Sequence, residues 1–105
     1  MRILLDACVP RGLRRHLSGH VVTTAHEKGW GDLDNGDLLD AMGADFDVLI
    51  TMDRGIPHQQ QLSERSFGLL LLRARSNRLA DLVPLAPHVL QQLASVKPGS
   101  VVVAG

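Results

Sequence analysis

The stretch that decides the fold is "VLITMDRG", residues 48–55, in which an apolar run ends on an acid, a base and a glycine. A short apolar run of this length indicates a buried strand. A second run, "RILLDACVP" at residues 2–10, is built in the same way and ends on Asp6, as the first ends on Asp53. The sequence therefore predicts two buried strands, each with a carboxylate at its carboxyl end.

Further apolar runs alternate with helical patterns along the rest of the chain. The expected strands lie at 2–7, 20–25, 47–52, 67–73 and 100–104, and the expected helices at 10–17, 35–42, 57–64 and 79–95. Apolar strands separated by helices are typical of a parallel sheet that is covered on both faces. We therefore expect one α/β domain over residues 1–105, a three-layer α/β/α sandwich around a mainly parallel five-stranded sheet.

Composition narrows the class of protein. The chain has 105 residues, of which 45% are hydrophobic and only 3% aromatic, so its core must consist of small aliphatic side chains. No apolar run approaches the roughly 20 residues of a membrane span, and the start of the chain has no signal-peptide pattern. The single cysteine, Cys8, forms no internal disulfide and suits a reducing compartment. These features predict a cytoplasmic protein without a membrane partner, of a size compatible with a homodimer.

The charges are segregated although the net charge is zero. The segment 27–53 contains eight of the eleven acids and a single base, Lys28. Arginines cluster on either side, at residues 11–15 and again at residues 73–78. An ordinary solvated surface explains any one of these charges, but the segregation indicates an acidic middle region flanked by basic patches.

The two strand-ending acids suggest a metal site. In the strand order 2-1-3-4-5 the strands that end on Asp6 and Asp53 are neighbours, with axes about 4.8 Å apart, and ligands bind beyond their carboxyl ends. Carboxylates this close repel each other unless a cation such as Mg²⁺ or Mn²⁺ lies between them. Asp37, in the first turn of the helix expected at 35–42, and the amide of Asn35 offer further oxygen ligands. Such an ion orients a phosphodiester and helps to generate a nucleophilic water, with Asp6, Asp37 and Asp53 as the catalytic acids.

At this point the motifs resemble those of a known family. The opening "LLD" followed by "VP", the "NGDLL" segment and the "T-x-D-R" that closes the third strand resemble compact PIN-like proteins over nearly the whole chain. The resemblance implies cleavage of RNA with Mg²⁺ or Mn²⁺, and a toxin that an antitoxin protein holds in check. It matches Asp6 to the acid after the first strand and Asp53 to the acid of the "T-x-D" strand.

The chain also departs from that family. The wider family has an acid eighteen residues before the "T-x-D" acid, where this chain has Asn35, with Asp37 two places further on. Either Asp37 substitutes for the missing acid or the metal site is weaker by one charge. The inserted helical region of larger PIN domains, which carries another acid, is missing.

Several polar residues near the expected edge of the sheet are candidates for binding substrate. Arg54 could hold a phosphate or pair with a nearby acid, and Gln59 and Gln60 could contact substrate or remain solvated. After the fourth strand, "RARSN" at residues 73–77 contains Arg73, Ser76 and Asn77, whose side chains suit contacts with backbone phosphates.

Two other functions remain open. A catalytically silent PIN-like scaffold that binds RNA or protein is supported by Asn35 in place of an acid. A receiver-type phosphoacceptor, with Asp53 as the acceptor, has acids after the same two strands. Receivers also have a second acid next to the first, which Asp6 lacks, and a Lys-Pro after the fifth strand, whereas Lys97 precedes the last strand here.

Overall fold

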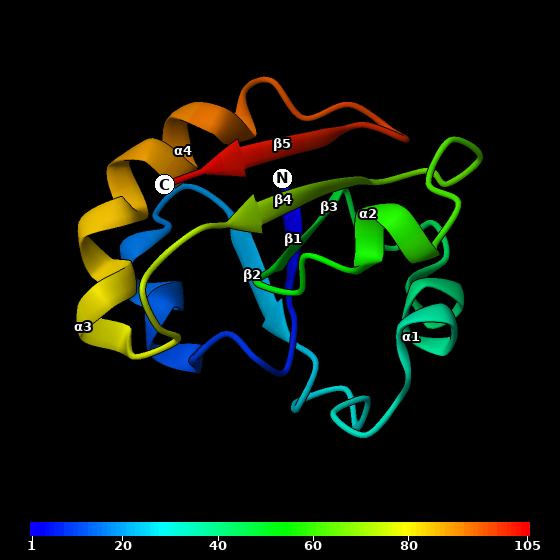
Figure 1. Cartoon of the computed structure of the whole chain (residues 1–105), viewed down its shortest axis with the longest axis horizontal. Coiled ribbons are helices and arrows are strands. Elements are labelled where there is room, and N and C mark those ends of the chain that lie inside the picture. The colour runs from blue at the N-terminus through cyan, green and yellow to red at the C-terminus, as the bar shows by residue number, and fades with distance from the viewer.

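The computed structural model describes all residues of the chain, 1–105. Its centre is a five-stranded sheet in which every pair of neighbouring strands is parallel, in the order β2-β1-β3-β4-β5 (Figure 1). The strands are β1 (Arg2–Leu5), β2 (Val21–Thr24), β3 (Val48–Thr51), β4 (Gly68–Leu72) and β5 (Val101–Ala104). The expected α/β class is therefore confirmed, and the two acid-ending strands, β1 and β3, are neighbours.

Four α-helices and two 3₁₀ helices connect the strands. They are η1 (Arg11–His16), α1 (Asn35–Met42), α2 (Ile56–Gln59), α3 (Leu79–Leu82), η2 (Val83–Leu85) and α4 (Ala86–Leu93). The long helix expected at 79–95 is divided into three segments, because Pro84 and Pro87 have no N–H to continue a helical ladder and occur only in first turns. None of these helices has the length and apolar composition that crossing a bilayer requires.

The helix expected at 57–64 is wrong beyond Gln59. The backbone of Gln60 is extended, with φ −118° and ψ 140°, so α2 ends after a single turn. The segment expected to be a helix at 10–17 is likewise the tighter 3₁₀ helix η1. Both are short connections at the carboxyl edge of the sheet, where packing decides the local conformation.

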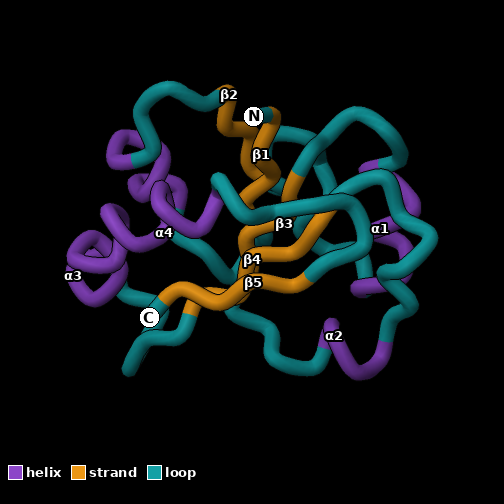
Figure 2. The backbone as a smooth tube through the Cα atoms, turned by 90° about the horizontal axis from the view of Figure 1, so that it is seen from above, coloured by secondary structure: helices purple, strands orange, loops and turns teal.

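The helices cover both faces of the sheet (Figure 2). On one face Ile3, Leu5 and Ile50 pack with buried residues of η1, α3 and α4. On the other face Leu4, Leu49 and Leu69 pack with buried residues of α1 and α2. Two separate apolar clusters on a fully parallel sheet are compatible with the expected three-layer sandwich.

The alternation of side chains along a strand determines where the polar residues at its end lie. Leu5 of β1 pairs with Ile50 of β3, and the next step of the ladder is the hydrogen bond from the Asp6 N–H to the Ile50 carbonyl, 3.0 Å. Asp6 therefore stands level with Thr51. Because successive side chains point to opposite faces, Asp6 and Thr51 follow Leu4 and Leu49 on the face that α1 covers.

Candidate functional site

A buried hydroxyl connects the two strand-ending acids. The Thr51 side chain is 0% exposed, and its Oγ1 donates to Asp6 Oδ2 at 2.7 Å. The same oxygen accepts the backbone N–H of Asp53 at 3.0 Å. Asp6 and Asp53 therefore lie within two hydrogen bonds of each other at the carboxyl edge of the sheet.

Asp6 is held in one orientation by hydrogen bonds to both of its carboxylate oxygens. Its Oδ1 accepts the backbone N–H of Ala7 at 2.7 Å, while Oδ2 accepts the Thr51 hydroxyl. The Cys8 sulfur lies 3.8 Å from Asp6 Oδ2. Burial raises the pKa of the Cys8 thiol, and the charge of Asp6 acts in the same direction. The Cys8 thiol is thus protonated at neutral pH and acts as a weak donor. It is not a nucleophile, because the nucleophilic form of a cysteine is the thiolate.

Asp53 is held by the loop that follows β3 and by the start of α1. Its Oδ1 accepts the Gly55 N–H at 2.8 Å, and its Oδ2 accepts Asn35 Nδ2 at 2.9 Å. The N-cap of this helix is Asp34, whose side chain accepts the Asp37 N–H. Because Asp34 satisfies the free backbone donor, the Asn35 side chain is available to reach Asp53.

No positively charged side chain neutralises either acid. The protein has three ion pairs, Arg2–Asp47, Arg14–Glu27 and Arg65–Asp40. Asp6 and Asp53 are in none of them, although both are half-buried. Two neighbouring carboxylates that are held only by neutral donors form a site of negative potential, which favours a bound cation.

The oxygens present suit a hard divalent cation with few protein ligands. Asp6, Asp53 and Asn35 lie together, and Mg²⁺ commonly takes one or two carboxylates and keeps several waters. The Asn35 amide now presents its NH₂ group to Asp53, so it would have to turn to present its oxygen to an ion. The structure contains no group of three His, Cys, Asp or Glu side chains placed for a metal.

Asp37, the expected third acid, is not part of this cluster. It is exposed on the first turn of α1, and its carboxylate forms no hydrogen bond or ion pair. Its backbone N–H serves the cap made by Asp34. The structure thus brings Asn35, and not Asp37, into contact with Asp53.

The glutamines after Asp53 lie beside the cluster. A β-carbon built on Gly36 would lie 3.5 Å from Gln60 Oε1, which places the Gln60 amide against the start of α1, next to Asn35. A β-carbon on Gly55 would lie 3.2 Å from Gln59 Nε2 and 3.1 Å from Asp53 Oδ1. Both amides are therefore within reach of a ligand bound at the carboxylates.

Arg54 and Arg73 lie together at a shallow hollow that extends along β4 and β5. The hollow has a volume of about 340 Å³ and also contains Leu71 of β4 with Val101 and Val103 of β5. Neither arginine forms an ion pair, so the structure does not contain the alternative pairing of Arg54 with a nearby acid.

Ser76 and Asn77 are engaged with the protein itself. The Ser76 hydroxyl donates to Asp81 Oδ2 at 2.5 Å and accepts the Arg78 N–H. The Asn77 amide donates to the carbonyl oxygen of Cys8 at 3.3 Å, which places the end of "RARSN" beside the loop after Asp6. These bonds give both side chains a structural role next to the site.

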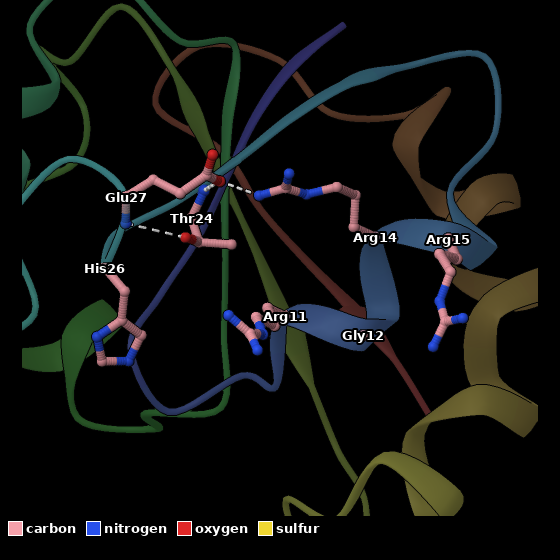
Figure 3. Close-up of a pocket in the computed structure, with 7 residues that line it drawn as sticks. All are labelled: Arg11, Gly12, Arg14, Arg15, Thr24, His26 and Glu27. Atoms are coloured by element: carbon pink, nitrogen blue, oxygen red, sulfur yellow. Dashed lines mark hydrogen bonds and ion pairs between the residues drawn. The ribbon is translucent and has the colours of Figure 1, made fainter.

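Two features of this edge were not predicted from the sequence. One is Thr51, which the spacing of "T-x-D" could have suggested as the connector between the acids. The other is the largest hollow of the molecule, about 540 Å³, which we call the arginine pocket (Figure 3). It is lined by Arg11, Gly12, Arg14, Arg15, Thr24, His26 and Glu27. Its sequence signals are "RGLRR" and the spacing of Thr24 and Glu27, a pattern typical of a capping box.

Comparisons with family models, with curated proteins and with solved structures found no match to this chain.

Proposed function

We propose that this chain is a metal-dependent ribonuclease of the PIN-like type, with its metal site at Asp6 and Asp53. The observation that supports it best is the Thr51 bridge, which joins the Asp6 carboxylate to the backbone N–H of Asp53, with neither acid neutralised by a base. They lie beyond the carboxyl ends of adjacent parallel strands, where α/β sheets bind their ligands.

Each residue of the cluster has a distinct task in this proposal. Asp6 and Asp53 hold Mg²⁺ or Mn²⁺, and Asn35 supplies an amide oxygen. The metal would polarise the phosphodiester and lower the pKa of an attacking water. Thr51 and the N–H groups of Ala7 and Gly55 fix the carboxylates, as hydrogen bonds behind metal ligands commonly do.

Other parts of the proposal come from the sequence motifs. The PIN-like resemblance supplies RNA as the substrate class and an antitoxin protein as a partner in the cytoplasm. Gln60 and Arg54 contact the substrate in this proposal, because one lies beside Asn35 and the other directly follows Asp53. A homodimer is compatible with the proposal and is not needed for the site, whose ligands all come from one chain.

A silent scaffold is the second candidate, and one contact favours it. The Asn35 amide donates to Asp53, so it occupies an oxygen that a metal would use, and no third acid joins the cluster. The receiver alternative has less support. Lys97 lies in the turn before β5, next to Gly68 at the opposite edge of the sheet from Asp53, where it cannot act on a phosphoryl group.

Calorimetric titration with Mn²⁺ tests the metal site directly. We expect one site in the wild-type protein, and affinity that is at least about tenfold weaker in Asp6→Asn and in Asp53→Asn, because each change removes a charged ligand. Asp32→Asn is the matched control, since Asp32 is an exposed acid without a hydrogen bond or ion pair. Equal Mn²⁺ affinity in all four proteins would refute the metal site.

Cleavage of mixed RNA separates the candidate functions. The nuclease requires cleavage that depends on Mn²⁺ and is lost in Asp6→Asn and Asp53→Asn but kept in Asp32→Asn. RNA that is bound but left intact with Mn²⁺ present would favour the scaffold. A stable adduct of 80 Da, about the mass of one phosphoryl group, after incubation with acetyl phosphate would favour the receiver.

A further inference from the structure

The arginine pocket is polar throughout. Four of its seven lining residues come from η1 and three from the end of β2 and the turn that follows, and none is hydrophobic. Its formal charge is +2, with three arginines against Glu27 and with His26 neutral. Figure 3 shows Arg11 extending toward the side that holds His26, whereas Arg15 projects from the far end of η1.

The β2 side of the pocket is held by reciprocal hydrogen bonds. The Thr24 N–H donates to Glu27 Oε1 at 2.9 Å, and the Glu27 N–H donates to Thr24 Oγ1 at 3.1 Å. Arg14 pairs with the same Glu27 oxygen (Figure 3). The His26 ring packs over Gly31, where a β-carbon would lie 2.9 Å from Nδ1. The turn that carries His26 is therefore held by the hydrogen bonds between Thr24 and Glu27 and by the packing of His26 against Gly31.

The arginines of the pocket have donors that the protein does not use. Arg11 and Arg15 form no ion pair or side-chain hydrogen bond, so only Arg14 is neutralised. Arg14 also carries the only buried side-chain nitrogen or oxygen in the protein without a hydrogen-bond partner, its Nε. Arg14 Nε is itself closed to solvent, so a ligand in the pocket would use the exposed and unpaired donors of Arg11 and Arg15.

The pocket lies at the same edge of the sheet as the carboxylates. Thr24 pairs with Leu5 in the parallel ladder, and Leu5 directly precedes Asp6. Thr24 follows the face of the sheet that η1 covers, and Asp6 follows the face that α1 covers, so the pocket and the carboxylates lie on either side of this edge. A nucleic-acid strand that crosses the edge would pass both places.

We propose that the arginine pocket binds a phosphate group of the RNA strand whose cleavage is proposed above, and the inference rests on that function. Arginine presents a planar fork of donors that matches phosphate oxygens. The lack of apolar lining disfavours a stacked base or an apolar peptide side chain. The site would position one phosphate beside η1 and so set which linkage reaches Asp6 and Asp53.

Binding without metal tests the pocket separately from catalysis. The full-length chain is titrated in EDTA with inorganic phosphate, with a 5′-phosphorylated RNA oligonucleotide and with its 5′-hydroxyl counterpart, and backbone amide signals are followed by NMR. We expect inorganic phosphate to shift the signals of residues 11–15 and 24–27. Arg11→Ala should weaken binding of the phosphorylated oligonucleotide at least about tenfold, by loss of charge-assisted bonds.

Arg75→Ala is the matched control, because Arg75 is exposed and has no ion pair, and it should bind as the wild type does. Tighter binding of the phosphorylated oligonucleotide identifies a terminal phosphate as the ligand, and equal binding of the two identifies an internal linkage. A loss of affinity in Arg11→Ala that matches the loss in Arg75→Ala overturns the proposal. So does preference for a phosphoserine peptide over both oligonucleotides.

The two proposals fail in distinguishable ways. If Mn²⁺ does not promote cleavage but Arg11→Ala still weakens RNA binding in EDTA, the nuclease is wrong and the pocket stands. If cleavage requires Asp6 and Asp53 but Arg11→Ala binds and cleaves as the wild type does, the pocket is wrong and the nuclease stands.

Discussion

Asp47 at one edge of the sheet is held in the opposite way to Asp6 and Asp53 at the other. At the amino edge Asp47, which precedes β3, pairs with Arg2 of β1, with Oδ1 3.0 Å from Nη2 and Oδ2 accepting the Arg2 N–H at 2.7 Å. At the carboxyl edge Asp6 and Asp53 form no ion pair, and they accept hydrogen bonds only from neutral groups. The fold therefore neutralises an acid at one edge and leaves two without a counter-charge at the other.

This difference separates acids that belong to the fold from acids that are available to a ligand. An acid paired with a base needs no further cation, whereas Asp6 and Asp53 have no base beside them and remain available to one. The amino edge is also closely packed, since β4 begins at a glycine against the turn before β5. Changes at the amino edge should thus affect stability, and changes at the carboxyl edge should affect ligand binding as well.

The largest loss of stability is expected from Gly68→Ala at the amino edge. A β-carbon there would lie 2.6 Å from the Lys97 carbonyl oxygen and 2.6 Å from Val96 Cγ1, and the backbone contact cannot move aside. We expect the free energy of unfolding to fall by about 3 kcal/mol, the upper range for overpacking. Urea unfolding measures it.

Gly36→Ala is the control for that prediction. Its new β-carbon would have only ordinary contacts, the nearest at 3.5 Å, and the position is helical. Alanine should therefore raise stability there by about 0.5 kcal/mol. Equal unfolding free energies for the two variants would contradict the close packing at Gly68.

Thr51→Val should have the next largest effect, because it removes the bridge at the carboxyl edge. Valine keeps the shape of the buried side chain but leaves the Asp53 N–H and Asp6 Oδ2 without their partner. We expect a loss of about 2 kcal/mol in urea unfolding, and weaker Mn²⁺ binding in the folded protein. Thr51→Ser keeps the hydroxyl and should retain the Mn²⁺ affinity. If both variants bind Mn²⁺ as the wild type does, the bridge does not organise the site.

Asn35→Asp sharpens the comparison by adding a third unpaired acid at the carboxyl edge. Its carboxylate would replace the amide that donates to Asp53 at 2.9 Å, so the metal-free protein should lose stability through repulsion. With Mn²⁺ the same charge should strengthen binding about tenfold, because ligand charge sets affinity at such sites. Calorimetry and thermal unfolding with and without Mn²⁺ measure both effects. Asp37→Asn is the control and should change neither.

The smallest effect concerns the ion pair at the amino edge. Hydrogen bonds from the Arg2 side chain and backbone lower the pKa of Asp47. As the pH falls through the usual aspartate range, about 4, the unfolded chain therefore binds a proton at Asp47 before the folded protein does. The contribution of Asp47 to stability is present above that range and is lost below it. Asp47→Asn should remove this part of the pH dependence of urea unfolding. The effect is small because the pair is exposed to solvent.

Asp32→Asn is again the control, because Asp32 has no partner and its loss should leave the pH profile unchanged. A profile for Asp47→Asn that coincides with the wild-type profile would show that the pair contributes nothing to folding.

Local sequence patterns were enough to predict the sheet. Each strand is a short apolar run, and the limits expected from the sequence lie within two residues of those in the structure. The neighbouring positions of β1 and β3 follow from the order 2-1-3-4-5 that was considered for the sheet. Asp6 and Asp53 could therefore be placed at one edge without coordinates.

The contacts between elements could not be predicted in the same way. The Thr51 bridge depends on the register of β1 against β3, and the direction of the Asn35 side chain depends on which residue caps α1. The arginine pocket forms where η1 meets the turn after β2, more than ten residues away in sequence. Such contacts are set by packing across the fold, and a pattern of residue types along the chain does not contain them.

The alternation of side chains between the two faces of β1 limits how this sequence can evolve. An insertion or deletion of one residue within β1 would turn Leu4 and Asp6 to the wrong faces together, so a lineage cannot relocate this acid without losing the core. Asn35 has no such constraint, because it stands on the first turn of a helix that packs through other residues. The proposed activity at this edge could thus be weakened or restored by single substitutions on α1 while the scaffold stays the same.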